Sequence, residues 1–282
     1  MTTVIRYAIG EAFRRKVFLV VLVLTLIFLG LDALANHYIF SDLTHFHVPE
    51  DVHVDVRTFA ATFVIGMSMF ATLFLGVVLA VFLTLGAVSG DAERGLLQPL
   101  VVRPLGRRSM LLARFLAAAG VCVVYVLVVY FVALAITGTE GSWWPQSIVT
   151  PGLLLAAAVV VMTAMSLLGS VFLGGTANGI AIFMLFIAGL VAGLLGTIGH
   201  ALGSHTISHA ATIAAWVLPF EALYQDALHQ LVAGTHGFTT FLLQLGPFGG
   251  SYNSGWGVRG WAAAYLVMVG AAALTAFARR DL

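Results

Sequence analysis

The chain has 282 residues, of which 61% are hydrophobic and 9% are charged, and its formal net charge at pH 7 is +1. Soluble domains contain about 25% charged residues, so this composition excludes an ordinary soluble protein and predicts an integral membrane protein. The length accommodates about six spans of roughly 20 residues. The single cysteine, Cys122, excludes an internal disulfide and a cysteine-based metal site.

Residues 2–16 combine apolar and basic side chains at helical spacing. The apolar residues recur on one helix face, and the charge comes mainly from Arg6, Arg14, Arg15 and Lys16. We predict an interfacial amphipathic helix here, and the alternative is an ordinary basic flank of a span. The apolar run that follows predicts a first span over about residues 17–35, with Asp32 near its far end.

Two long uncharged runs flank a short basic segment. No charge occurs in the 33 residues between Arg57 and Asp91, nor in the 25 residues of Phe115–Thr139. These runs predict spans over about residues 58–89 and 111–137. A helix of the first length measures about 50 Å, against a hydrocarbon core of about 30 Å, so we expect it to project from the membrane on the basic side.

A further 80 residues, Gly141–Phe220, carry no formal charge. A glycine-containing break at residues 174–178 divides them into predicted spans over about 149–173 and 179–200. Small residues recur along and just beyond the second of these spans, at Gly189, Gly193, Gly196 and Gly203. Small residues at such spacing let helices approach closely, so they predict a dimer seam or the lining of a path, or alternatively packing within one subunit.

The region between the fifth and sixth predicted spans contains a short amphipathic helix. It starts at Pro219 and ends near Gly234, which is too short to cross a bilayer, so we expect it to lie at the surface or to enter and return. Six glycines within residues 246–260 predict a flexible connector. A last span is predicted over about residues 260–278.

The cationic side chains are distributed very unequally. Of the 13 Lys and Arg residues, all except Arg57 and Arg259 fall on the side that includes Arg94. The positive-inside rule therefore places residues 90–114 and both termini in the cytoplasm, which requires an even number of spans. The fold class predicted is an all-α integral membrane protein with six spans, and we treat residues 1–282 as one transmembrane domain.

This topology puts all nine histidines on the outer side: His37, His45, His47, His53, His200, His205, His209, His229 and His236. His205 and His209 share a helix face at a spacing that can bind Zn or Cu, but no third ligand accompanies them. We therefore predict no metal site and no cofactor.

The sequence lacks the residues expected for ion-coupled transport and for nucleotide binding. Spans two to six contain no acidic residue or histidine well inside the bilayer, which argues against ion-coupled transport. The only lysine, Lys16, follows Arg15, so the Gly-Lys pair of a P-loop does not exist. We predict that the chain is not an enzyme and that any ATP hydrolysis belongs to another polypeptide.

The basic segment itself resembles a known signature. It reads Gly90-Asp91-x-Glu93-Arg94-Gly95-Leu96-Leu97, followed by Pro104-Leu105-Gly106-Arg107 and by Leu111-Leu112-Ala113-Arg114-Phe115. This pattern, together with the layout of the whole chain, resembles ABC-2 type permeases, the membrane subunits of one class of ATP-binding-cassette transporters. The sequence departs from the pattern at three positions, with Leu96 for Thr, Pro99 inside the short helix and Arg114 for Lys. Proline is tolerated only in the first turn of a helix, so the helix should start near Leu96.

The resemblance implies a short cytoplasmic coupling helix between spans two and three, seated in a groove of an ATPase subunit. The residues expected to make this contact are Asp91, Glu93, Arg94, Gly95, Leu96, Leu97, Leu100, Arg103, Pro104 and Arg107. An apolar patch in a water-exposed loop independently favours a protein partner. The arginines are expected to bind either acidic ATPase residues or anionic lipid headgroups.

The function implied is that of a permease subunit in a prokaryotic plasma or inner membrane. It would export an amphipathic substrate with ATP hydrolysed by a separate subunit, and its partners would be that ATPase, a second permease subunit and lipids, with no nucleic acid. The alternative is a membrane subunit that passes ATPase work to an extracytoplasmic partner, for example in metal-centre maturation. The outer histidines and the amphipathic segment 219–234 motivate that alternative.

Overall fold

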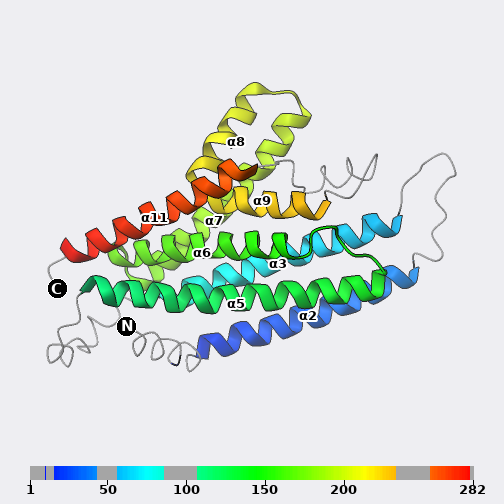
Figure 1. The fold of residues 1–282 in the computed structure, drawn as a ribbon, viewed down its shortest axis with the longest axis horizontal. Coiled ribbons are helices and arrows are strands. Elements are labelled where there is room, and N and C mark those ends of the chain that lie inside the picture. Colours follow the sequence, from blue (N-terminus) through cyan, green and yellow to red (C-terminus); the bar gives the residue numbers. More distant parts are fainter. Residues whose placement is uncertain (1–9, 11–15, 43–55, 86–106, 233–254, 280–282) are drawn as a thin grey trace.

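The computed structural model describes residue 10 and residues 16–42, 56–85, 107–232 and 255–279, and the regular structure in this part of the chain is entirely helical (Figure 1). The elements in chain order are α2 (Lys16–Asp42), α3 (Val56–Thr84), α5 (Arg107–Gly141), α6 (Val149–Phe172), α7 (Gly175–Ala201), α8 (His205–Val217), α9 (Pro219–Val232) and α11 (Gly255–Arg279). The all-α prediction is confirmed.

Six of these helices are long and apolar enough to cross a membrane, namely α2, α3, α5, α6, α7 and α11. The two shorter helices, α8 and α9, form the expected excursion between the fifth and sixth spans. The predicted interfacial helix and coupling helix fall outside the described residues, apart from Gly10, Lys16 and Arg107. The six-span prediction is therefore confirmed, and the chain is a multi-pass membrane protein.

The first span is longer than its apolar run suggested. Helix α2 continues to Asp42, whereas the sequence predicted an end near residue 35. Polar residues continue the helix because they have partners: Asn36 Nδ2 donates to the carbonyl oxygen of Asp32 at 2.8 Å, and both side chains are buried. One turn later, the buried Phe40 ring lies against Gly141 at the end of α5.

The bundle has two distinct ends. Helices α2, α5, α6 and α11 run roughly along its long axis, and α7 and α8 form a hairpin that projects away from it (Figure 1). The start of α2, the start of α5, the turn between α6 and α7 and the end of α11 all lie toward one end of the molecule. Successive spans therefore run in opposite directions, as six consecutive membrane crossings require.

Helices α3 and α6 form the centre of the packed core. Buried residues include Met69 and Leu73 of α3, Val126 of α5, and Leu155 and Val159 of α6. Gly76 on α3 allows close approach, since an added Cβ would lie 2.9 Å from methyl groups of both Val126 and Val159. Lipid tails are as apolar as these side chains, so close packing and hydrogen bonds, rather than exclusion of water, hold such helices together.

Short hydrogen bonds connect the spans at three levels. The Thr25 and Tyr125 hydroxyls lie 2.6 Å apart between α2 and α5, and Ser68 of α3 donates to Asp32 Oδ1 of α2 at 2.5 Å. The Thr84 hydroxyl of α3 lies 2.6 Å from that of Ser166 on α6. Asn178 of α7 then donates to the Ser166 carbonyl oxygen at 2.9 Å, which links three helices.

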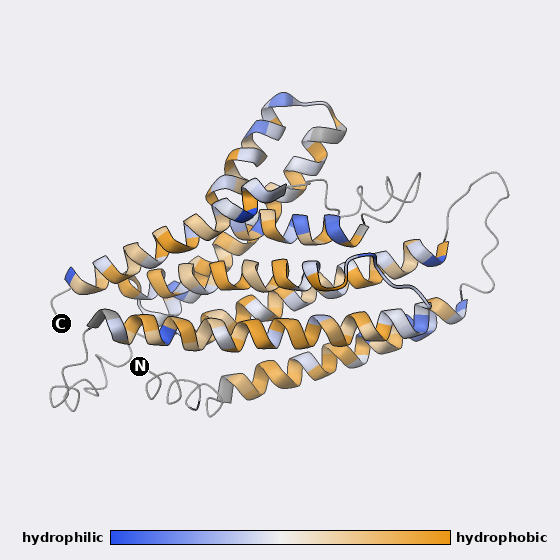
Figure 2. Cartoon of the chain, in the orientation of Figure 1, coloured by the Kyte–Doolittle hydropathy of each residue, from blue (hydrophilic) through white to orange (hydrophobic). Residues whose placement is uncertain are grey.

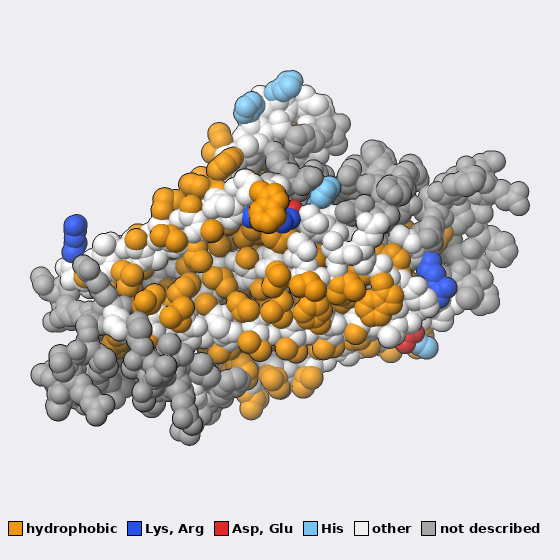
Figure 3. All heavy atoms as spheres, in the orientation of Figure 1, with side chains coloured by type: hydrophobic (Ala, Val, Ile, Leu, Met, Phe, Trp, Pro, Cys, Tyr) orange, Lys and Arg blue, Asp and Glu red, His pale blue; other side chains and the backbone are white. Residues whose placement is uncertain are grey.

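Apolar side chains cover the outside of the bundle. Helices α2 and α7 expose many large ones, among them Leu19, Leu26, Ile180, Met184 and Ile187. The helices are orange along most of their length in Figure 2, and Figure 3 shows an apolar band with charged side chains toward its ends. An exposed apolar surface of this extent is the surface that a hydrocarbon core contacts.

Candidate functional site

Helix α9 lies inside the protein and not on its surface. It begins at Pro219, a favoured first helical residue, and Glu221 stands in its first turn, where an acidic residue suits the positive helix end. Its apolar face, including Phe220 and Tyr224, is buried. Its polar face is buried as well, with side chains at 4% exposure for Glu221, 9% for Gln225 and 0% for Asp226.

The buried acids of α9 have different partners. Asp226 Oδ2 accepts a hydrogen bond from Arg259 Nε of α11 at 2.8 Å, and the two groups form an ion pair. The Arg259 guanidinium also lies 5.4 Å from the centre of the Trp256 ring, within the range of a cation–π contact. Glu221 Oε1 accepts a hydrogen bond from the neutral Gln225 amide at 2.8 Å. The cationic partner in this cluster therefore belongs to Asp226.

Burial without a cation changes the acidity of Glu221. Desolvation disfavours the charged carboxylate and raises the pKa of Glu221 from 4.5 to about 7, although the Gln225 hydrogen bond opposes this rise. Burial and the nearby Glu221 charge also raise the pKa of the Tyr224 hydroxyl. Glu221 thus changes protonation state near neutral pH.

Three of the small residues predicted along the fifth span, Gly189, Gly193 and Gly196, lie on α7 and contact other helices of the same chain. A Cβ on Gly189 would overlap the Phe220 ring, and a Cβ on Gly193 would overlap the Glu221 carboxyl group. At Gly196 it would lie 3.2 Å from the Ala211 methyl of α8. Gly203 lies in the turn before α8 with φ of +63°, a conformation that glycine adopts without strain. A role of these glycines in a seam between subunits stays a prediction.

A small cavity lies where α7, α8, α9 and α11 meet. Its volume is about 50 Å³, and its walls include Gly193, Gly196, Trp216, Glu221, Gln225 and Trp261. Trp261 Nε1 donates to the Trp216 carbonyl oxygen at 2.8 Å, so the two indole-bearing segments of α8 and α11 are tied together. The rings themselves lie 5.4 Å apart, centre to centre.

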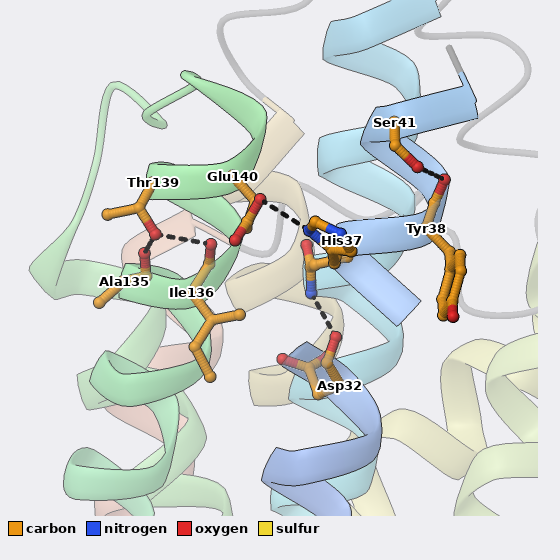
Figure 4. A network of polar contacts seen from close by, with 9 residues as sticks. Asp32, His37, Tyr38, Ser41, Ala135, Ile136, Thr139 and Glu140 are labelled. Carbon is orange, nitrogen blue, oxygen red and sulfur yellow. Dashed lines mark hydrogen bonds and ion pairs between the residues drawn. The ribbon is translucent and has the colours of Figure 1, made fainter. Parts of the chain in front are cut away.

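A second polar cluster joins α2 to α5 and α3. His37 Nδ1 lies 3.7 Å from Glu140 Oε2 at an exposed position, and Asp32 lies deeper in α2 (Figure 4). Asn36, next to His37 in the chain, donates its side-chain amide to the Asp32 carbonyl oxygen. Asp32 Oδ2 and Asn36 Oδ1 are buried and have no hydrogen-bond partner in the described chain. The sequence placed Asp32 near the far end of the first span and gave no sign that Ser68 would contact it.

The histidine pair on α8 is exposed, and α8 itself projects from the bundle with pale-blue side chains at its far end (Figure 3). His205 and His209 are one turn apart, as predicted. Among the described residues, no group of three or more His, Cys, Asp or Glu side chains is placed to hold a metal ion.

The residues predicted to couple the chain to an ATPase lie between α3 and α5. Asp91 to Pro104 fall outside the described residues, and Arg107 is the first residue of α5. The flanking helix ends, at Thr84 and Arg107, lie toward the same end of the bundle as the start of α2 and the end of α11 (Figure 1).

A family model described as "ABC-2 family transporter protein" matches residues 3–282. The chain belongs to the ABC-2 transporter family. No curated protein matches it. The resemblance to ABC-2 type permeases found in the sequence is thereby confirmed over residues 3–282.

Membership of the ABC-2 family makes the chain a membrane permease subunit of an ABC transporter. Such a subunit is a transport component and not itself an enzyme, and the family implies association with an ABC ATPase. Two parts of this ABC-2 permease are then of functional interest: the segment between α3 and α5, and the buried cluster around Glu221.

Proposed function

We propose that this permease exports an amphipathic substrate across the cell membrane as one half of a dimeric transporter, using ATP hydrolysed by a separate nucleotide-binding subunit. The family match over residues 3–282 is the observation on which the proposal rests. It is supported by the absence of a Gly-Lys pair from the sequence and by six spans that carry few charges.

The ATPase acts, in this proposal, on the segment between α3 and α5. The apolar patch of Leu96, Leu97 and Leu100 occupies a groove of the ATPase, and Glu93 and Arg94 form ion pairs at its rim. Movement of the segment is passed to α3 and α5. These helices are closely packed around Gly76, so they transmit displacement as rigid rods.

The proposed topology places both termini and residues 90–114 in the cytoplasm. This orientation is supported by the 13 Lys and Arg residues, of which only Arg57 and Arg259 fall on the other side. The shared position of the α2 start and the α11 end agrees with it (Figure 1).

The decisive experiment replaces the charged pair in the coupling segment. We expect Glu93→Ala combined with Arg94→Ala to abolish stimulation of the partner ATPase and transport, while the chain still inserts in the membrane. The matched control is Arg279→Ala combined with Asp281→Ala, which removes an acid and a base on the same predicted side but outside the segment. Normal coupling in the first variant, or equal loss in the control, would contradict the proposal.

A second function is favoured by the projecting hairpin of α7 and α8. Its exposed His205 and His209 and its exposed Ile213 offer a contact surface outside the bundle. The permease would then pass ATPase work to an extracytoplasmic protein without moving a solute. Co-purification of such a protein, lost on chelation of metal ions or in His205→Ala with His209→Ala, distinguishes this function from export.

A further inference from the structure

Glu221 is a buried acid that has no cationic partner among the described residues, and it borders a cavity. Its side chain is 4% exposed, and the nearest cation of the cluster, Arg259, is hydrogen-bonded to Asp226. The carboxyl group lies against the backbone of α7, in space that a side chain at Gly193 would fill. A buried carboxylate is costly unless a proton, a metal ion or a cation neutralises it.

Among the described residues, the side chains around Glu221 bring no further positive charge to the cavity. Residues 189–196 of α7 and all of α6 include no titratable residue, and α8 contributes Ala211, Thr212, Ala215 and Trp216 to the walls. On α9, the titratable neighbours are Tyr224 and Asp226, and on α11 the neighbour is the paired Arg259. His205 and His209 are on α8 but are exposed. Within the described part of the chain, a cation in the cavity would therefore meet attraction from Glu221 and no repulsion from an unpaired base.

The polar atoms at the cavity also favour a hydrogen-bond donor. Gln225 donates its amide to Glu221, and its own carbonyl oxygen has no hydrogen-bond partner in the described chain. The remaining walls are small apolar residues and the Trp216 and Trp261 rings. A volume of about 50 Å³ fits a small headgroup and not a whole amphiphile, so an apolar body would extend along the half-exposed Trp216.

We propose that the cavity between α7, α8, α9 and α11 binds the ammonium group of an amphipathic amine, with Glu221 as its counter-ion and the two tryptophans as walls. The ammonium donates hydrogen bonds to the Glu221 carboxylate, and Gln225 Oε1 is the second acceptor within the cluster. The aromatic faces attract the same positive charge. When Glu221 is protonated in the empty site, binding releases that proton to water, so one positive charge enters as another leaves.

This inference goes beyond the proposed export function, because the site is expected to bind an amine without ATP and without an ATPase subunit. The test therefore uses the purified full-length permease in lipid nanodiscs. Binding of phenethylamine, which has a primary ammonium on a small apolar body, is measured by saturation-transfer NMR and by quenching of tryptophan fluorescence. Its neutral analogue 2-phenylethanol and the anion 3-phenylpropanoate are the matched ligands.

We expect phenethylamine to bind and both analogues to bind at least about tenfold more weakly, since a hydrogen bond to a charged group contributes about 1.5–3 kcal/mol. Glu221→Gln, which keeps the shape of the side chain, should weaken amine binding at least about tenfold. The control Glu140→Gln makes the same change at an exposed acid of α5 and should leave binding unaltered. Equal binding of the amine to the wild-type chain and to Glu221→Gln would overturn the proposal.

The pH dependence of the wild-type chain gives a test that needs no variant. Alkylamines stay protonated below pH 9, like lysine. The Glu221 pKa of about 7 in the empty site therefore sets the pH profile, and amine binding should weaken about tenfold from pH 8 to pH 6. Amine binding that does not change between pH 6 and pH 8, or equal affinity for phenethylamine and 2-phenylethanol, would contradict the proposed ammonium site. Loss of ATPase coupling in the Glu93 and Arg94 variant would leave this result unchanged, so the two proposals fail separately.

Discussion

Glu221 and Asp226 show how two acids on one helix acquire different chemistry. They stand five residues apart on α9, and both are buried. Asp226 is neutralised by Arg259 of α11 at 2.8 Å, whereas Glu221 has only the Gln225 amide. The same buried face of α9 thereby holds one acid with a cationic partner and one acid, Glu221, whose charge depends on pH near neutrality.

At the residue scale, the raised pKa of Glu221 predicts a pH dependence of stability. A carboxyl group whose pKa is higher in the folded state favours folding at low pH, and this contribution falls as pH rises from 4.5 to about 7. The expected loss is about 3 kcal/mol across that window, because one pKa unit corresponds to about 1.4 kcal/mol. Thermal unfolding of the detergent-solubilised chain at pH 5, 6, 7 and 8 measures it.

The isosteric variant isolates this effect from other titrating groups. Glu221→Gln cannot ionise, so its melting temperature should fall less between pH 5 and pH 8 than that of the wild-type chain. The exposed acid in Glu140→Gln is the control, and its profile should follow the wild type. Parallel profiles for Glu221→Gln and the wild-type chain would show that another group controls the stability in this range.

At the scale of the element, the sequence predicts helix α9 but not the contacts of its polar face. The amphipathic pattern of residues 219–232 correctly predicted a short helix with a buried apolar face, because that pattern is local. The burial of its polar face depends on Arg259, which lies 33 residues further along the chain in another helix. In the same way, the Asp32–Ser68 contact joins residues 36 positions apart, so the spacing of residues within α2 could not reveal it.

The glycines of α7 were recognised in the sequence, but their packing partners were not. Their spacing predicted close packing correctly, but the sequence left open which helix would pack there. The structure brings α8 and α9 of the same chain against Gly189, Gly193 and Gly196. By contrast, the composition and the charge distribution were sufficient to predict six spans, because hydrocarbon imposes one requirement on every span regardless of its neighbours.

At the element scale we expect Gly193→Ala to separate α9 from α7. The added methyl group would overlap the Glu221 carboxyl group, and overpacking of this kind costs about 1–3 kcal/mol. The variant should unfold at a lower temperature and bind phenethylamine more weakly. Gly270→Ala in α11 is the matched control, since its methyl group meets nothing within 4 Å and should leave stability unchanged or raise it.

On the scale of the whole molecule, the single cysteine makes the topology directly measurable. Cys122 is free and its side chain is 0% exposed, so the wild-type chain should not react with a membrane-impermeant maleimide. In the proposed topology, Leu97→Cys reacts in inside-out vesicles and Asp51→Cys reacts in right-side-out cells. Reaction of residue 97 from the outside would contradict the cytoplasmic position of the coupling segment.

The hydrogen bonds among Thr84, Ser166 and Asn178 tie three spans together at the point where α3 ends. Thr84 is the last residue of α3, and Asn178 lies in the first turn of α7. A pull on the residues after α3 therefore strains α6 and α7 at their adjoining ends before it reaches the middle of the bundle. Helix α7 also packs against α8 and α9. We therefore expect a displacement of the α3 end by an ATPase to be transmitted through α7 to α8, α9 and the cavity between them (Figure 1).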